Sequence, residues 1–176
     1  MPYVVAALVL VGIVAGLNLL LTVGVIRRLR EHTETLRQVR SGTGSSFLPA
    51  GSPLPALTGV TTVTGTPVVA PAALVAFFST TCAPCREKLP SFRDHVRAAA
   101  VNGSDVLVVV EGAADDASEF VAALRDVGQV VVEPELGPVA KSFAVNGFPT
   151  FYALGPDGRV LVGTHEVAEL PVPATP

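Results

Sequence analysis

The two cysteines carry the most distinctive chemistry of this chain, and they stand close together in the motif Cys82-Ala83-Pro84-Cys85. The apolar run Leu74–Phe78 ends just before them, and a helix is predicted to begin at Ala83. At a helix N-terminus, unpaired backbone N–H groups and the helix dipole favour a thiolate, and a proline fits because no N–H is needed there. We therefore expect Cys82 to be the exposed nucleophile. Cys85, one turn later and more buried, would resolve a mixed disulfide.

Other uses of such a cysteine pair fit the sequence less well. A structural zinc site needs four ligands, but the chain has no third cysteine and only three histidines. Attachment of a c-type haem needs a histidine directly after the second cysteine, where this chain has Arg86. A purely structural disulfide across two residues would add little stability, because the stabilisation grows with loop length. No metal is therefore expected, and the redox-active group would be the Cys82–Cys85 disulfide itself.

The second half of the sequence alternates strand and helix signals around this motif. Continuous apolar runs are typical of strands that are buried on both faces of a layered sheet. The predicted strands are Leu74–Phe78, Val106–Val110, Val130–Val132, Thr150–Leu154 and Val160–Val162. The predicted helices are approximately Ala83–Ala100, Asp115–Val127 and Gly137–Val145. A turn sequence at residues 155–158 should make the last two strands a hairpin. This order indicates an α/β fold with a mixed central sheet covered by helices.

The N-terminal segment is the most apolar part of a chain in which 49% of the 176 residues are hydrophobic and 15% are charged. Residues 1–26 contain no charged side chain, and 20 of these 26 residues are hydrophobic. As a helix, residues 3–26 would span about 36 Å, enough for a hydrocarbon core of about 30 Å. A cleaved signal peptide is disfavoured, because no basic residue precedes the run and an arginine cluster follows it. We expect a transmembrane anchor at residues 1–26 that contacts the lipid bilayer through residues 3–26.

The rest of the chain divides into three predicted parts. Residues 27–53 would form a juxtamembrane helix and a flexible linker rich in Gly, Ser and Pro, residues 54–168 a folded domain, and residues 169–176 a C-terminal tail. Two cysteines and a formal net charge of −3 exclude a disulfide-stapled miniprotein and a polybasic nucleic-acid binder. No nucleic acid is therefore expected among the partners.

The motif and its surroundings resemble the thioredoxin superfamily over roughly residues 54–168. The likeness rests on the strand Leu74–Phe78, the cysteine motif, Pro90 in the following helix, and Gly147-Phe148-Pro149-Thr150 before the penultimate strand. With the N-terminal anchor added, the pattern looks like the membrane-tethered TlpA and ResA-like thiol-disulfide oxidoreductases. Its closest likeness is to their MauD-like branch, which is associated with methylamine utilisation.

This resemblance implies a thioredoxin-like fold and a set of roles. Cys82 would attack, Cys85 would resolve, and Pro149 would follow a cis peptide bond and face the two cysteines. Phe148, Pro149 and Thr150 would bind extended substrate backbone.

Three positions depart from the family pattern. Thr81 stands where thioredoxins usually have Trp, Ala76 stands at the position of their buried Asp, and Lys88 replaces an acidic residue of ResA-like proteins. The resolving thiol thus lacks a proton-transfer partner at both usual places. Glu87, one turn from the cysteines, and Glu111, at the end of the second predicted strand, are candidate substitutes. The alternative for each is an ordinary solvated surface carboxylate.

These features predict a membrane-tethered thiol-disulfide oxidoreductase that acts on protein thiols and disulfides through Cys82 and Cys85. The alternative is a thioredoxin-like interaction or maturation module with little general turnover, serving the biogenesis of cytochrome c or of an exported disulfide-rich enzyme. Relatives of this type expose the redox domain outside the cytoplasm, so we expect an extracytoplasmic domain and a membrane or extracytoplasmic redox partner. The five arginines in residues 27–40 argue the other way, because the positive-inside rule would keep that flank cytoplasmic.

Overall fold

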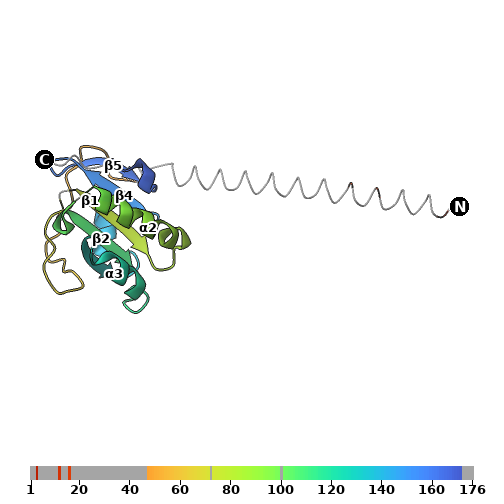
Figure 1. The fold of residues 1–176 in the computed structure, drawn as a ribbon, viewed down its shortest axis with the longest axis horizontal. Coiled ribbons are helices and arrows are strands. Elements are labelled where there is room, and N and C mark those ends of the chain that lie inside the picture. The colour runs from red at the N-terminus through yellow and green to blue at the C-terminus, as the bar shows by residue number, and fades with distance from the viewer. Residues whose placement is uncertain are drawn as a thin grey trace. The chain divides into compact units, whose positions relative to one another are not determined.

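The computed structural model describes residues 47–71, 73–99 and 101–171, together with Tyr3, Gly12 and Gly16. The predicted anchor and juxtamembrane helix therefore lie outside the described residues, apart from those three positions, which are helical. Within the described part of the chain, no helix combines the length and the apolar character that crossing a bilayer requires. The described residues from 47 onward belong to one compact unit, drawn as the coloured ribbon in Figure 1.

In the described residues, a five-stranded sheet forms the centre of this unit (Figure 1). Its strands are β1 (Leu74–Ser79), β2 (Val106–Glu111), β3 (Gln129–Glu133), β4 (Thr150–Leu154) and β5 (Val160–Thr164). The helices of the unit are α2 (Ala83–Ala98), α3 (Ser118–Leu124) and α4 (Pro138–Ser142), with 3-10 turns at Gly103–Asp105 and Val167–Glu169. The sheet order is β3-β2-β1-β4-β5; β1, β2 and β3 run parallel, and β4 and β5 form an antiparallel hairpin beside β1. The predicted mixed sheet and its closing hairpin are thus confirmed.

Alternating side chains of the strands build a separate hydrophobic cluster on each face of the sheet. On one face, Phe78 of β1 packs with α2 and α3 in a cluster that includes Cys85. On the other face, Phe77 packs with α4 and with the N-terminal segment that begins at Phe47. The strands β1 and β2 are buried along their whole length, as their continuous apolar runs predict.

Two helices are shorter than the sequence predicts. The segment that was expected to begin as a helix at Asp115 is a run of turns until α3 begins at Ser118. At the other helix, α4 ends at Ser142, since Ala144 adopts a left-handed conformation with φ 54° that is common directly after a helix. By contrast, α2 ends within two residues of its predicted C-terminus.

Residues 47–53, the described part of the predicted linker, pack against the sheet. Residues 47–53 run beside the edge strand β5, where the Val160 amide donates a hydrogen bond to the Ser52 carbonyl oxygen at 3.0 Å. The ring of Phe47 packs edge-on against the ring of Tyr152, with centroids 6.2 Å apart. The aromatic contact and the hydrogen bonds at the strand edge connect this segment to the sheet, in the same compact unit. Its flexibility stays a prediction.

The first residues of the predicted C-terminal tail contact the core. The second 3-10 turn continues through Glu169, and Leu170 is only 5% exposed in the cluster that contains Cys85. The apolar side chain of Leu170 thus adds to the cluster under α2.

Candidate active site

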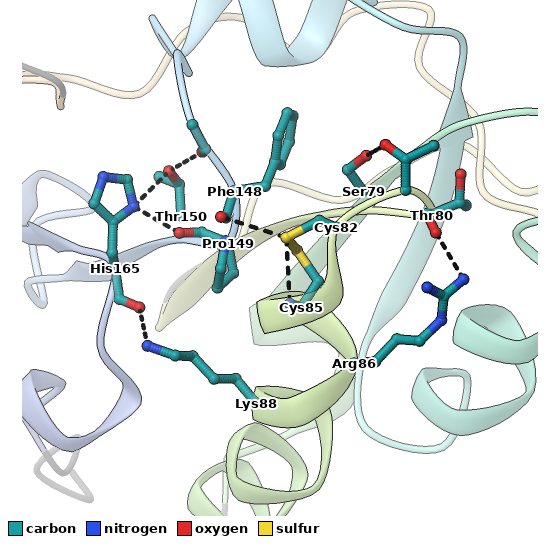
Figure 2. Close-up of a disulfide and its surroundings, with 12 residues drawn as sticks. Ser79, Thr80, Cys82, Cys85, Arg86, Lys88, Phe148, Pro149, Thr150 and His165 are labelled. Atoms are coloured by element: carbon teal, nitrogen blue, oxygen red, sulfur yellow. Dashed lines mark hydrogen bonds between the residues drawn. A yellow bond between two sulfur atoms is a disulfide. The ribbon is translucent and has the colours of Figure 1, made fainter. Parts of the chain in front are cut away.

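The cysteine pair lies at the N-terminus of α2, as predicted. Cys82 is the N-cap residue and is half-buried, whereas Cys85 is fully buried in the first turn. The two residues form a disulfide with Cα atoms 5.3 Å apart, and the Cys85 amide donates to the Cys82 sulfur at 3.2 Å (Figure 2). Because this amide would stabilise negative charge on the same sulfur after reduction, the geometry favours a thiolate on Cys82.

The loop before β4 faces this disulfide. The Phe148–Pro149 peptide bond is cis, as predicted, and the Phe148 carbonyl oxygen lies 3.4 Å from the Cys82 sulfur (Figure 2). In the disulfide neither sulfur carries a hydrogen, so this contact is a close approach; after reduction a Cys82 thiol could donate to the same oxygen. The loop thus places a main-chain acceptor beside the more exposed sulfur.

The same loop is held from inside by two side chains. Thr150, which the sequence places among the substrate-binding residues, is fully buried, and its hydroxyl donates to the Gly147 carbonyl oxygen at 2.7 Å. His165, directly after β5, donates from Nδ1 to the Pro149 carbonyl oxygen at 2.6 Å. The Thr150 side chain therefore supports the loop, while the main chain at Phe148 lies beside the disulfide.

His165 is a site residue that the sequence reasoning missed. In the β4–β5 hairpin, Phe151 stands opposite Thr164, and this register places His165 beside Thr150. The turn at residues 155–158 was a usable signal, because it fixes which strand ends meet. A register shift near the turn moves the pairing by one residue, however, so a count from the turn alone would have placed Thr164 opposite Thr150.

Arg86 holds the loop that leads into the cysteine motif. Its Nη2 donates to the Thr80 carbonyl oxygen at 2.7 Å, and its guanidinium carbon lies 5.9 Å from the centre of the Phe120 ring. Thr81, at the position where thioredoxins have Trp, is exposed. The main chain before Cys82 is therefore tied to α2 by a charged hydrogen bond.

The two carboxylates considered for proton transfer occupy different environments. Glu87 is exposed on α2. Glu111 is 6% exposed at the end of β2, where it accepts a hydrogen bond from the Leu136 amide at 2.9 Å. Burial raises the pKa of the Glu111 carboxyl, the Leu136 amide opposes this rise, and the charges of Glu135 and Glu133 add to it. Glu111 is therefore not the solvated surface carboxylate of the alternative interpretation.

The sheet separates the Glu111 side chain from Cys85. Glu111 follows the alternation of Val109, whose side chain packs on the α4 face. Cys85 packs on the opposite face together with Ala76, the residue at the position of the buried Asp of thioredoxins. The structure thus does not bring Glu111 and Cys85 to the same face, and the proton-transfer roles of Glu87 and Glu111 stay predictions.

The chemistry that this arrangement can perform is set by the unequal exposure of the two sulfurs. A thiolate from outside can approach Cys82, whereas Cys85 is 0% exposed. Attack at Cys82 would leave the second thiolate on Cys85, one turn away and in place to close the ring again. Among the described residues, no group of three or more His, Cys, Asp or Glu side chains is placed to hold a metal ion.

A scan against protein-family models found no match, and a search of curated proteins found none. Three solved structures illustrate the likenesses that were found. A Chlorobium tepidum protein, assigned as a thiol:disulfide interchange protein DsbE, has a TM-score of 0.52 and 24% identity, with 66% of this chain and 84% of that chain covered. A secreted disulfide oxidoreductase of Mycobacterium tuberculosis, described as homologous to E. coli DsbE, has a TM-score of 0.51 and 18% identity over 61% and 81% of the two chains.

The third is the thioredoxin domain of a thiol-disulfide oxidoreductase from Bacteroides vulgatus, with a TM-score of 0.53 and 21% identity over 66% and 88% of the two chains. These neighbours are named as thiol:disulfide interchange proteins or disulfide oxidoreductases. At such identities the likeness concerns the fold. Together with the five-stranded mixed sheet and the helices on its faces, it shows that this chain has an α/β thioredoxin-like fold.

Proposed function

We propose that the protein is a membrane-tethered thiol-disulfide oxidoreductase that exchanges disulfides with protein substrates through Cys82 and Cys85. The observation that carries the proposal is the asymmetry of the pair. Cys82 is partly exposed and its sulfur accepts a hydrogen bond from the Cys85 amide at 3.2 Å, whereas Cys85, to which it is bonded, is fully buried. The names of the structural neighbours agree with this activity.

Both directions of exchange pass through a mixed disulfide at Cys82. In the oxidising direction, a substrate thiolate attacks the Cys82 sulfur, and the broken Cys82–Cys85 bond leaves its electron pair on Cys85 as a thiolate. A second substrate thiolate then attacks the substrate sulfur and releases the Cys82 thiolate. In the reducing direction, the Cys82 thiolate attacks a substrate disulfide, forms the mixed disulfide and releases one substrate sulfur as a thiolate. The Cys85 thiolate then attacks the Cys82 sulfur, breaks the mixed disulfide and releases the second substrate thiolate. The cysteine pair itself carries the electrons, with no further cofactor.

Substrates would bind along the loop before β4. The Phe148 carbonyl oxygen lies 3.4 Å from the Cys82 sulfur, so an extended peptide that hydrogen-bonds to the main chain of Phe148 would bring its own sulfur to Cys82. Main-chain recognition makes the side-chain preference broad. Phe148 and Pro149 are thus the proposed substrate-binding residues, with Thr150 in support.

A turnover assay with the full chain in detergent tests the proposed activity. The assay follows reduction of a fluorescent peptide disulfide by dithiothreitol, with and without the protein. We expect the wild-type protein to accelerate the reaction and Cys82→Ser to leave it at the rate of dithiothreitol alone. Equal rates for the wild type and Cys82→Ser would contradict the proposal.

The tether and the location belong to the same proposal. Residues 1–26 would anchor the chain in the bilayer, and the redox domain would lie outside the cytoplasm with a membrane or extracytoplasmic redox partner, as the likeness to the MauD-like branch suggests. A membrane-impermeant thiol reagent, added to intact cells after reduction, should label Cys82. Protection of Cys82 until the cells are lysed would place the domain in the cytoplasm.

One observation favours a second candidate function, a maturation module with little general turnover. Ala76, which shares the buried cluster of Cys85, puts a methyl group where thioredoxins have a carboxyl. Without that group, deprotonation of Cys85 would be slow. In the turnover assay this candidate predicts a single rapid exchange with a peptide disulfide followed by negligible turnover.

A further inference from the structure

Three successive carbonyl groups of the loop before β4 each have a defined partner. The Gly147 oxygen accepts from the Thr150 hydroxyl at 2.7 Å, and the Phe148 oxygen lies 3.4 Å from the Cys82 sulfur. The third oxygen, on Pro149, accepts from His165 Nδ1 at 2.6 Å (Figure 2). The carbonyl beside the sulfur is therefore flanked on both sides by carbonyls that side chains hold in place.

The contact with Pro149 determines where His165 carries its proton. A carbonyl oxygen only accepts hydrogen bonds, so Nδ1 must be the protonated nitrogen. The Thr150 hydroxyl oxygen lies 3.4 Å from the same nitrogen and already directs its own hydrogen to Gly147, so it too can only accept from Nδ1.

A second residue ties His165 to the helix of the cysteines. Lys88 Nζ donates to the His165 carbonyl oxygen at 3.1 Å and forms an ion pair with Glu166 (Figure 2). Its side chain is 24% exposed, so this charge is partly shielded from water. Lys88 lies three residues after Cys85, which puts both on neighbouring turns of α2. Lys88 and His165 therefore connect α2 to Pro149 in the loop before β4. The contact between Cys82 and Phe148 joins the same helix and loop.

The imidazole is also held from the side by the segment that precedes the sheet. The rings of Phe47 and His165 have centroids 4.7 Å apart and planes tilted by 53°. A Cβ on Gly163 of β5 would collide with the Phe47 side chain, which shows how closely this segment approaches the strand. His165 is thus confined by Phe47, by Lys88 and by the loop that it supports.

From these contacts we propose that His165 is a positioning residue for exchange with peptide substrates, with Lys88 as its support. This inference rests on the proposed function. By holding the Pro149 carbonyl, His165 keeps the preceding Phe148 main chain in the orientation that an extended peptide must meet beside Cys82. A small disulfide that does not bind along the loop has no need of this orientation. Loss of the Nδ1 donor should therefore raise KM for a peptide disulfide much more than it slows reaction with a small disulfide.

The test compares His165→Leu with His165→Asn in the full chain in detergent. Leu removes the donor, whereas the Asn side-chain amide can donate from nearly the same place as Nδ1. We expect His165→Leu to raise KM for a peptide disulfide about tenfold, the effect of losing about one hydrogen bond, with kcat little changed. Its reaction with 5,5′-dithiobis(2-nitrobenzoate) should change less than twofold, and His165→Asn should recover most of the wild-type KM. His95→Leu, a change at another half-buried histidine, is the matched control and should behave as the wild type.

Several results would overturn the proposal. An unchanged KM in His165→Leu would do so, and so would a failure of His165→Asn to recover, or equal slowing with the peptide and the small disulfide. If thermal unfolding shows that His165→Leu is not folded, Lys88→Met replaces it in the test. We expect Lys88→Met to raise KM for the peptide disulfide about threefold, and no rise would again overturn the proposal. If the wild type reacts with neither disulfide, the proposed function itself fails; if it reacts normally and the variants match it, only the positioning role fails.

Discussion

Two regions at the C-terminal ends of the parallel strands differ in how far their reactive groups are exposed. At the end of β1, the chain continues to Cys82, which is partly exposed and whose sulfur faces a carbonyl oxygen of another loop. At the ends of the adjacent parallel strands β2 and β3, Glu111 and Glu133 are 6% and 5% exposed. Both carboxylates accept hydrogen bonds from backbone amides. The Leu136 amide donates to Glu111, and the amides of Val139 and Ala140 donate to Glu133. The first region thus leaves a cysteine partly exposed, whereas the second buries its carboxylates in hydrogen bonds to backbone amides.

A buried carboxylate near the cysteine pair can serve local structure, and Glu133 is the clear case. Glu133 holds both of its oxygens against the first turn of α4, at 2.9 and 2.8 Å from the two amides. A Cβ on Gly137 would collide with this carboxylate, so the sequence keeps a glycine there. We therefore expect the carboxylate region to act on stability and the sulfur region on exchange. Variants that alter one property without the other test this division.

The largest effect on stability is expected from Glu133→Gln. A glutamine offers one acceptor oxygen and turns its NH2 group toward the second amide, so one hydrogen bond to a charged group is lost and a donor faces a donor. The free energy of unfolding should fall by about 2 kcal/mol in urea denaturation, while the folded variant should exchange disulfides at the wild-type rate. The exposed neighbour Glu135 supplies the control, Glu135→Gln, which should be neutral. Slower disulfide exchange in folded Glu133→Gln would contradict the separation of a stability role for the carboxylate region from an exchange role for the sulfur region.

An intermediate effect is expected from Arg86→Ala, and here stability and exchange should change together. The variant loses the hydrogen bond to the Thr80 carbonyl oxygen and the contact with the Phe120 ring. We expect a loss of about 1 kcal/mol and a severalfold slower exchange, because the main chain that enters Cys82 is released. Arg125→Ala, at an exposed arginine just after α3, is the matched control. Loss of stability with full exchange activity would show that Arg86 does not position the motif.

The smallest effect on stability is expected from Glu111→Gln, and it depends on pH. Burial raises the pKa of Glu111 in the folded state, so its contribution to stability is fully present below the unfolded pKa and is lost as pH rises through the folded pKa. Gln cannot ionise. The free energy of unfolding of the variant relative to wild type should therefore increase as pH rises from acidic values toward neutrality, as chemical denaturation at several pH values can show.

The same variant separates the two candidate proton-transfer groups. Because the sheet lies between Glu111 and Cys85, Glu111→Gln should keep the wild-type exchange rate, and Glu87→Gln provides the matched change on α2. A slower resolution step in Glu111→Gln would show that this carboxylate handles the Cys85 proton after all. It would also place Glu111 in the sulfur region.

Local patterns were sufficient to predict the sheet and the position of the motif. Apolar runs indicated all five strands of the described sheet, and Thr150–Leu154 has the predicted limits at both ends. Two signals indicated that Cys82 stands at the start of a helix, where the structure has it as the N-cap. A predicted strand ends shortly before it, and Pro84 fits the first helical turn because no backbone N–H is needed at that position. Each of these signals lies within a few residues of the feature it predicts.

The missed features depend on contacts between distant segments. His165 lies 16 residues from Pro149, and a register shift in the hairpin brings the two together. Glu111 is buried and accepts a hydrogen bond from the amide of Leu136, 25 residues away in the sequence, a residue with a left-handed φ of 54°. The contacts of residues 47–53 include packing of Phe47 on β4 and β5, which composition does not reveal.

The central claim, that exchange proceeds through a mixed disulfide at Cys82, is tested most directly by trapping that species. The full chain carrying Cys85→Ser or Cys82→Ser is incubated with a peptide disulfide, and the covalent adduct is quantified by mass spectrometry without reduction. We expect a stable adduct at Cys82 in Cys85→Ser and none in Cys82→Ser. Equal adducts in both variants, or none in either, would contradict it.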